Sequence, residues 1–427
     1  MENTIKPQKR ISQRIAEFFF TLYMITLYIF VDREETVIIS KVVFVLFAIF
    51  TVISVLRRKS IHIGKNVMSV YIAFTWMFAT VFWAKNEYNA TYMMKTMWQI
   101  FILFFLTYNL FAKEKDAHDK ILKSLYVAGI VLLIYSIFIY GIMDVIKIME
   151  VESNVRLGKE INQENSFGIM NATTTIVAFS YLLYKRKYKA FHSVMIVLSF
   201  FFAMASGSRK AVLMICIGAA ILILKKYKLR YAHRAIARGM ILLIVLLFVI
   251  NLPIFDSINS RLEGMINLIT GGGKVESSVN LRWEMIVDGW EAFKERFLMG
   301  YGANNYRNIA RYKTYSHNNF IEILVDFGVV GFFLYYLIYF MAFKNLWKSE
   351  HGAGKALLSI FFVRFIMEIA FVTYYSKTQW VLMAFFLINV SQEQEKQKNT
   401  ADCLLQENKE DSSSDPADDT VVVQNEI

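Results

Sequence analysis

Residues 318–343 read NNFIEILVDFGVVGFFLYYLIYFMAF, an apolar block in which Glu322 and Asp326 are the only charged side chains. The block shows no period-two alternation, and it is long enough to cross about 30 Å of hydrocarbon as a helix. Only helices and closed barrels satisfy all backbone hydrogen bonds in lipid. The block therefore predicts a membrane-spanning helix.

Similar blocks recur along the 427 residues, of which 56% are hydrophobic and 19% charged. We therefore predict an all-α polytopic membrane protein of about 12 transmembrane helices rather than a soluble domain. The predicted spans are 14–31, 37–56, 66–84, 92–112, 121–141, 165–184, 190–207, 211–224, 237–253, 318–343, 355–373 and 377–391.

Lysine and arginine residues are distributed unevenly between the two sides of these spans. The polar segments predicted to lie on the same side of the membrane as the N-terminus hold 24 Lys and Arg residues. The short loops predicted to lie on the other side hold 8. Because basic loops are retained in the cytoplasm, both termini are predicted to be cytoplasmic. The net charge of +12 reflects this distribution, and there is no basic soluble domain to bind nucleic acid.

The predicted membrane domain covers residues 1–391, and one large extracytoplasmic loop at 254–317 is inserted before the helix at 318–343. The tail at 392–427 is rich in Ser, Asp, Glu and Gln and is predicted to be disordered in the cytoplasm. The loop is predicted to contain an amphipathic helix that either lies in the outer headgroup layer or packs the loop. Its apolar stripe consists of Trp283, Ile286, Trp290, Phe293 and Phe297.

Polar side chains from three segments are predicted to meet at the outer membrane boundary. Arg209 follows the span at 190–207, Arg282 opens the amphipathic helix, and His317 precedes the block quoted above, with Ser316 as candidate N-cap. Guanidinium groups suit phosphate oxygens, and an imidazole beside two of them tends to stay neutral and able to accept a proton. The pattern predicts a site that holds a phosphate-bearing substrate while a hydroxyl is deprotonated.

Each of these residues also has a plainer interpretation. A boundary arginine can be a topology or headgroup anchor, and a histidine after a serine can be part of a cap. Glu322 and Asp326, four residues apart, either orient His317 or the arginines or form a buried polar pair. Arg364 and Glu368 have the same spacing and are predicted to form an ion pair, with an ion pathway as the alternative.

Several short motifs follow one another along the chain. They are Asn162-Gln163-Glu164-Asn165, Ser208-Arg209-Lys210-Ala211, Arg282-Trp283, Met299-Gly300-Tyr301-Gly302-Ala303-Asn304-Asn305-Tyr306, Ser316-His317-Asn318-Asn319-Phe320, Asp326-Phe327-Gly328 and Gly331. Their order resembles the signature of the bacterial O-antigen polymerase and O-antigen ligase superfamily, the Wzy/WaaL-like integral membrane glycosyltransferases. The proline usual in the first motif is absent here. The resemblance extends over nearly the whole chain.

This resemblance implies a GT-C-like fold and transfer of a glycan from undecaprenyl diphosphate to an acceptor hydroxyl, at the outer face of the bacterial cytoplasmic (inner) membrane. It places the family's two essential arginines, which bind the diphosphate, on Arg209 and Arg282, and its essential histidine, the base, on His317. Beside these residues, Asn318, Glu322 and Asp326 are expected to support the site. The family uses no metal, and no metal-ligand cluster or nucleotide fingerprint appears in the sequence, so neither metal nor cofactor is expected.

We therefore expect a polymerase of lipid-linked oligosaccharide repeat units in the synthesis of a capsular or O-antigen-type surface polysaccharide. The expected partners are the undecaprenyl-diphosphate-linked oligosaccharide, an acceptor glycan and membrane lipid, with a flippase and chain-length regulator proteins as further partners. The alternatives are a ligase with another acceptor, a flippase or other transporter of lipid-linked oligosaccharide, and a structural scaffold. A transporter is expected to show repeat symmetry and helices broken at mid-membrane.

Overall fold

The computed structural model describes residues 7–30, 34–59, 61–141, 156–185, 187–227 and 277–389. Every regular element in this part of the chain is helical, which confirms the predicted all-α class. The predicted span at 237–253, the first part of the predicted loop and the tail at 392–427 lie outside the described residues.

The helices follow the predicted apolar blocks. In chain order they are α1 (Pro7–Ile29), α2 (Val37–Arg58), α3 (Lys65–Ala79), the 3-10 helix η1 (Thr80–Trp83), α4 (Glu87–Phe111), α5 (Ala117–Tyr140), α7 (Glu164–Tyr184), α8 (Lys189–Ala205), α9 (Arg209–Lys226), α12 (Ser277–Glu295), α13 (Tyr306–Ile309), α14 (Asn319–Trp347), α15 (Gly352–Met367) and α16 (Lys377–Leu387).

Five of these helical segments are long and apolar enough to cross a membrane: α2, α3 with η1, α5, α7 and α14. The apolar helix α8 has 17 residues, α15 has 16 and α16 has 11, fewer than the roughly 20 needed to cross the hydrocarbon core. The chain is thus an integral membrane protein with several candidate spans, and the count of 12 stays a prediction.

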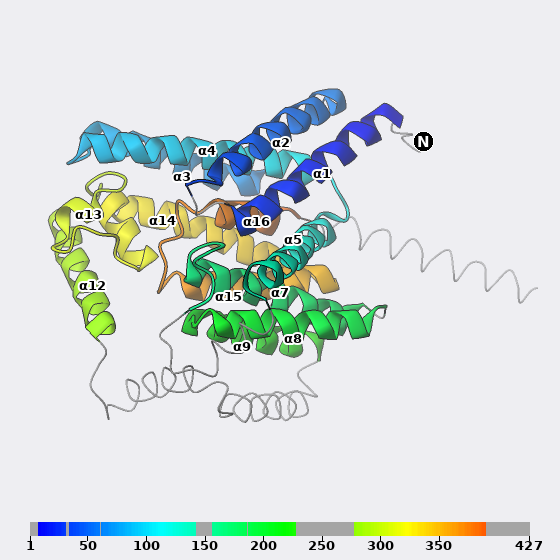
Figure 1. Ribbon diagram of the computed structural model, residues 1–427. Coiled ribbons are helices and arrows are strands. Elements are labelled where there is room, and N and C mark those ends of the chain that lie inside the picture. Colours follow the sequence, from blue (N-terminus) through cyan, green and yellow to red (C-terminus); the bar gives the residue numbers. More distant parts are fainter. Residues whose placement is uncertain are drawn as a thin grey trace, which may run out of the picture.

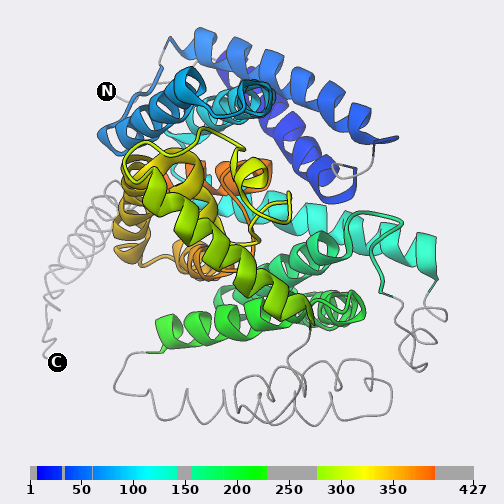
Figure 2. The same ribbon diagram turned by 90° about the vertical axis from the view of Figure 1, so that its left-hand side faces the viewer.

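The helices lie side by side in one bundle, shown in Figure 1. α1 packs on α2 and α5, α7 packs on α8 and α9, and α14 packs on α3, α12, α15 and α16. Their buried faces form a continuous apolar core rich in large aromatic side chains. Helices α12 and α13 lie at one end of the bundle, at the left of Figure 1, and Figure 2 shows α12 crossing that end. We call it the His317 end.

A helix, α12, lies where the sequence predicted an amphipathic helix in the loop. Its Phe293 is 5% exposed and belongs to a small core shared with the start of α14. Trp283 and Trp290 from the same predicted stripe are 65% and 47% exposed. One edge of α12 therefore packs the loop onto the bundle, and the exposed tryptophans on its other side suit a headgroup layer.

α14 is broken at Gly328, where the predicted span at 318–343 was expected to be continuous. The glycine has φ 68° and ψ −175°, and the helix resumes beyond it. Backbone groups that the break removes from the helical ladder find other partners. The Trp76 indole donates to the Phe327 carbonyl at 3.0 Å, and the Val329 N–H donates to the Phe297 carbonyl at 2.8 Å. The loop after α12 thus completes the hydrogen bonding of α14.

Replacing Gly328 by alanine is expected to destabilise the protein. A Cβ atom there would lie 2.2 Å from the carbonyl oxygen of Leu298, and the left-handed φ is itself unfavourable for alanine. We expect a loss of at least about 2 kcal/mol, seen as a lower thermal transition in detergent. Phe333→Ala, on a side chain that is 68% exposed, is the control. Equal transitions for the two variants would contradict this account of the break.

Candidate functional site

The three residues predicted to form the site lie at the His317 end. Arg209 is the first residue of α9, Arg282 lies in the first half of α12, and His317 lies in the loop that ends where α14 begins. Arg282 is close enough to His317 for its charge to act on the imidazole. Arg209 is an electrostatic neighbour of Arg156, a residue that the sequence analysis did not single out.

The backbone of His317 is held in an unusual conformation by its neighbours. Its φ is 56°, a left-handed value that few non-glycine residues adopt. The Ser316 N–H donates to Glu322 Oε2 at 2.7 Å, and the Ser316 hydroxyl donates to the Asn318 carbonyl at 2.6 Å. The Asn318 side chain caps α14 by accepting the Ile321 N–H at 3.1 Å. The predicted N-cap at Ser316 is therefore wrong, because its hydroxyl is already engaged in the loop.

The His317 imidazole is half-buried, and its ring centre lies 4.1 Å from that of Tyr315. Burial first, and then the charges of Arg282 and Lys210, lower the pKa of His317 to about 4. Both causes disfavour the charged imidazolium. The side chain is therefore neutral near pH 7, and one ring nitrogen carries no proton. Of the two arginines predicted to keep the imidazole neutral, Arg282 is among the causes of the lowered pKa and Arg209 is not, whereas burial and Lys210 were not predicted.

Lys210 is a cation of this site to which the sequence analysis assigned no role. Its ammonium donates to the Ala370 carbonyl at 2.5 Å and lies 3.5 Å from the centre of the Phe371 ring. Burial first, and then the charges of Arg282 and Arg156, lower the pKa of Lys210 to about 7, so the amine is only partly protonated near pH 7. Its position directly after Arg209, at the start of a helix, could have indicated that Lys210 belongs to the site.

Arg156 holds the turn between α8 and α9 that carries Arg209. Its Nε donates to the Ser206 carbonyl at 2.9 Å, and a terminal N–H donates to Asn165 Oδ1 at 3.0 Å. Gly207 supplies the left-handed residue of this turn, with φ 60°. The Asn-rich motif at the start of α7 is thereby linked to the turn before Arg209.

Asp326 is fully buried and organises the loop that runs into α13. Its Oδ1 accepts the backbone N–H groups of Asn305 at 3.0 Å and Tyr306 at 2.8 Å. Its Oδ2 accepts the Asn304 N–H at 2.8 Å and the Tyr374 hydroxyl at 2.9 Å. A carboxylate has lone pairs for all four donors, so the buried group is satisfied without a cation in contact.

Glu322 and Asp326 each bond to a different part of the loop before α14. Glu322 bonds to the backbone directly before His317, and Asp326 bonds to the loop backbone at Asn304, Asn305 and Tyr306. Both carboxylates thus bond to the loop that carries His317, and both are buried.

The predicted ion pair between Arg364 and Glu368 is wrong. Arg364 Nε donates to Gln379 Oε1 at 2.9 Å, and Glu368 accepts from Asn319 Nδ2 at 3.1 Å. Glu368 lies just beyond the last helical residue of α15, where neutral hydroxyl groups surround it. The hydroxyl groups that donate to it belong to Tyr335, Tyr336, Tyr339 and Thr373.

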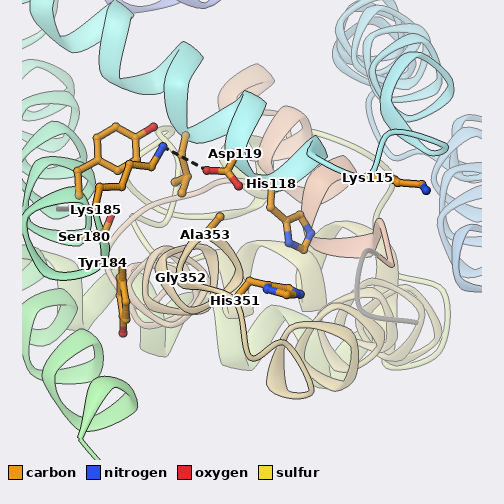
Figure 3. Close-up of a pocket in the computed structure, with 11 residues that line it drawn as sticks. Lys115, His118, Asp119, Ser180, Tyr184, Lys185, His351, Gly352 and Ala353 are labelled. Atoms are coloured by element: carbon orange, nitrogen blue, oxygen red, sulfur yellow. Dashed lines mark ion pairs between the residues drawn. The ribbon is translucent and has the colours of Figure 1, made fainter. Parts of the chain in front are cut away.

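Two cavities lie at opposite ends of the bundle. The larger has a volume of about 610 Å³ and adjoins the site, because its wall includes Tyr315 and Phe371. The smaller, of about 330 Å³, lies where α5 and α15 begin and α7 ends. Figure 3 shows its lining, which includes His118 and a Lys185–Asp119 ion pair of 3.3 Å. Since the length of α7 separates it from Arg156 and Arg209, the smaller cavity is not part of this site.

The site therefore combines a neutral imidazole with several cations from separate segments. These cations are Arg156, Arg209, Lys210 and Arg282. Within the described ranges, no group of three or more His, Cys, Asp or Glu side chains is placed to hold a metal ion. An arrangement of this kind can bind a polyanion such as a diphosphate and accept a proton beside it.

Replacing Asp326 by asparagine is expected to destabilise the loop before α14. The amide nitrogen would face groups that donate hydrogen bonds to the carboxylate, leaving at least one buried donor unsatisfied at a cost of about 1–3 kcal/mol. We expect faster hydrogen exchange at residues 304–306 and a lower thermal transition. Glu291→Gln, in an ion pair whose glutamate side chain is 62% exposed, should change neither. Unchanged exchange at residues 304–306 would show that Asp326 does not hold this loop.

Comparison with known proteins provides a family for this region. A family model described as O-antigen ligase matches residues 194–336. The match covers less than half of the 427 residues but includes Arg209, Arg282 and His317. The match supports the resemblance of the sequence motifs to the O-antigen polymerase and O-antigen ligase superfamily. No curated protein matched the chain.

Proposed function

We propose that the chain, whose residues 194–336 match a family model described as O-antigen ligase, is a membrane glycosyltransferase that moves a glycan from undecaprenyl diphosphate to an acceptor hydroxyl. The observation that carries the proposal is the neutral His317 beside the cations Arg282 and Lys210. The donor is a lipid with an anionic leaving group, and the acceptor must lose a proton. The cations of the described site suit the anionic leaving group, and the imidazole suits the proton of the acceptor.

The arginines would bind the diphosphate of the donor lipid. Arg282 on α12 and Arg209 on α9 present planar groups that suit phosphate oxygens. As the glycosyl bond breaks, negative charge grows on the departing diphosphate, and fixed cations stabilise it in a partly water-excluded site. Lys210 and Arg156 add to this field. Lys210 is held in place by the Ala370 carbonyl and the Phe371 ring.

His317 would act as the general base. It accepts the proton of the acceptor hydroxyl while the acceptor oxygen forms a bond to the anomeric carbon. The bond from that carbon to the diphosphate oxygen breaks, and its electron pair leaves with the diphosphate. Direct displacement of this kind inverts the anomeric carbon. The left-handed backbone at His317, fixed through Ser316 and Glu322, would hold the imidazole in place for the transfer.

Polymerase and ligase reactions share the donor and the base and differ only in the acceptor. We propose a polymerase of lipid-linked repeat units, because polymerases are the broader class in this superfamily. The second candidate is a ligase, which the description of the matched family favours. The break in α14 is a feature expected of a transporter. Here the Phe327 carbonyl accepts a hydrogen bond from Trp76 and the Val329 N–H donates one to the loop after α12, so the break supports the loop instead.

Substitution of the three site residues is expected to abolish transfer without unfolding the protein. His317→Ala, Arg282→Ala and Arg209→Ala should each lower the rate about 100-fold or more, measured with lipid-linked oligosaccharide in nanodiscs. Arg311→Ala on the same loop, at a side chain that is 70% exposed, is the control and should retain the rate. Full activity of folded His317→Ala protein would refute the proposed base.

The lipid-linked glycans of a strain carrying His317→Ala identify the reaction. Loss of a polymerase leaves single repeat units on the outward-facing lipid. Loss of a ligase leaves long chains still attached to undecaprenyl diphosphate, and loss of a flippase leaves repeat units facing the cytoplasm. Either of the last two patterns would exclude the polymerase.

The pH dependence of transfer should differ from that of an ordinary histidine base. Because the pKa of His317 is lowered to about 4, the base is already neutral above that pH. We expect kcat/KM to stay constant from about pH 5.5 to 8 rather than fall below about 6.5. Arg282→Gln removes one cause of the shift, so its residual activity should begin to fall at a higher pH than in the wild type. A wild-type decline centred near pH 6.5 would contradict the assigned environment.

A further inference from the structure

The larger cavity contains two cationic side chains. Arg364, near the end of α15, and Lys377, the first residue of α16, both line it. Among the described residues no ion pair joins either of them to a carboxylate, and no Asp or Glu lines the cavity. Lys41 adds a third positive charge close enough to act on Lys377. The charged side chains that line the cavity are therefore all cationic.

Glu368 does not neutralise Arg364 by contact. It feels the charge of Arg364, but its oxygens accept hydrogen bonds from Asn319, Thr373 and three tyrosines. Arg364 Nε is bound to the neutral Gln379. A guanidinium kept inside a helical bundle without a carboxylate in contact is costly. An anionic ligand in the cavity would reduce that cost.

The rest of the cavity wall suits a sugar. It offers hydroxyl and amide groups from Gln163, Ser166, Thr173, Ser376 and Thr378. Aromatic side chains that can pack on the faces of a pyranose ring are also present, among them Tyr28, Tyr315, Phe371 and Tyr375. The volume of about 610 Å³ lies within the usual range of ligand pockets, roughly 300–1,000 Å³.

The cavity adjoins the proposed site through two side chains. Tyr315 lines the cavity, and its ring centre lies 4.1 Å from that of His317. Phe371 lines it too, and the Lys210 ammonium lies 3.5 Å from the centre of that ring. A molecule in the cavity would thus lie beside His317, and the donor diphosphate would bind Arg209 and Arg282 on the other side of the imidazole.

We propose that this cavity is the acceptor subsite and that it takes a sugar residue bearing a carboxylate or phosphate group, bound by Arg364 and Lys377. The inference rests on the proposed transferase function and adds the chemical class of its acceptor. Arg364 and Lys377 bind the anionic substituent, the hydroxyl and amide groups bind the ring, and the free hydroxyl points toward His317. The donor diphosphate is left to Arg209 and Arg282.

Binding of defined oligosaccharides to purified full-length protein in nanodiscs tests this assignment without requiring turnover. The probes are three matched tetrasaccharides that end in glucuronic acid, glucose 6-phosphate or glucose. We expect the wild type to bind one of the two anionic probes at least 10-fold more tightly than the neutral probe. Arg364→Gln and Lys377→Gln should each lower the affinity for that anionic probe roughly 10- to 100-fold and leave the affinity for the neutral probe unchanged.

Lys294→Gln, on the exposed face of α12, is the matched control and should bind like the wild type. If Arg364→Gln does not fold, Lys377→Gln alone tests the proposal. Lys377 is partly exposed at the cavity wall, so its substitution is expected to leave the fold intact. Equal binding of the three probes, or anionic binding insensitive to Lys377→Gln, would overturn the proposal. Arg364-dependent binding of farnesyl diphosphate in place of the sugars would also overturn it, by assigning the cavity to the lipid.

The transferase assay separates this inference from the function on which it rests. Loss of transfer in His317→Ala, together with unselective sugar binding in the wild type, would leave the function in place and remove the acceptor assignment. Selective anionic binding in a protein that transfers no glycan would remove the function and leave an acidic-sugar site.

Discussion

The buried carboxylate of Asp326 gathers the segments on which the site depends. Its two oxygens accept three consecutive loop N–H groups, from Asn304 to Tyr306, and the hydroxyl of Tyr374. The first three bonds fix the loop that leads to His317. The fourth fixes the segment between α15 and α16, which carries Phe371 and the lining of the larger cavity. A neutral side chain of this size lacks the lone pairs to accept four donors.

This arrangement also requires two glycines, one in each of two separate motifs. The break in α14 at Gly328 brings that backbone against the loop after α12, and a Cβ atom on Gly300 would lie 2.5 Å from the Gly328 nitrogen. Both glycines have φ of 68°. The Tyr301 and Gly302 N–H groups then bond to the Val325 and Asp326 carbonyls, each at 2.8 Å. The motifs Met299-Gly300-Tyr301-Gly302 and Asp326-Phe327-Gly328 are thus two halves of one backbone contact.

Much of this architecture could be predicted from the sequence. Apolar blocks located the helices because burial in lipid requires long apolar segments, and the stripe around Phe293 located α12. Spacing within a helix was less reliable as a guide to contacts. It paired Arg364 with Glu368, but Glu368 lies past the end of α15 and takes its donors from α14 and the segment after α15. Likewise, Arg156 and Lys210 could not be assigned, because their partners come from distant parts of the chain.

Under the proposed function, the site would be prepared for an anion before one binds. Its cations repel one another, and together with burial they keep His317 neutral. A diphosphate bound among them would add negative charge close to the imidazole. That charge opposes the effect of Arg282 and Lys210 and raises the pKa of His317 from about 4 toward its ordinary value. Since a stronger base accepts a proton more readily, donor binding would itself activate the base. An acceptor hydroxyl that arrives first would meet a weak base, and transfer would require both substrates to be in place.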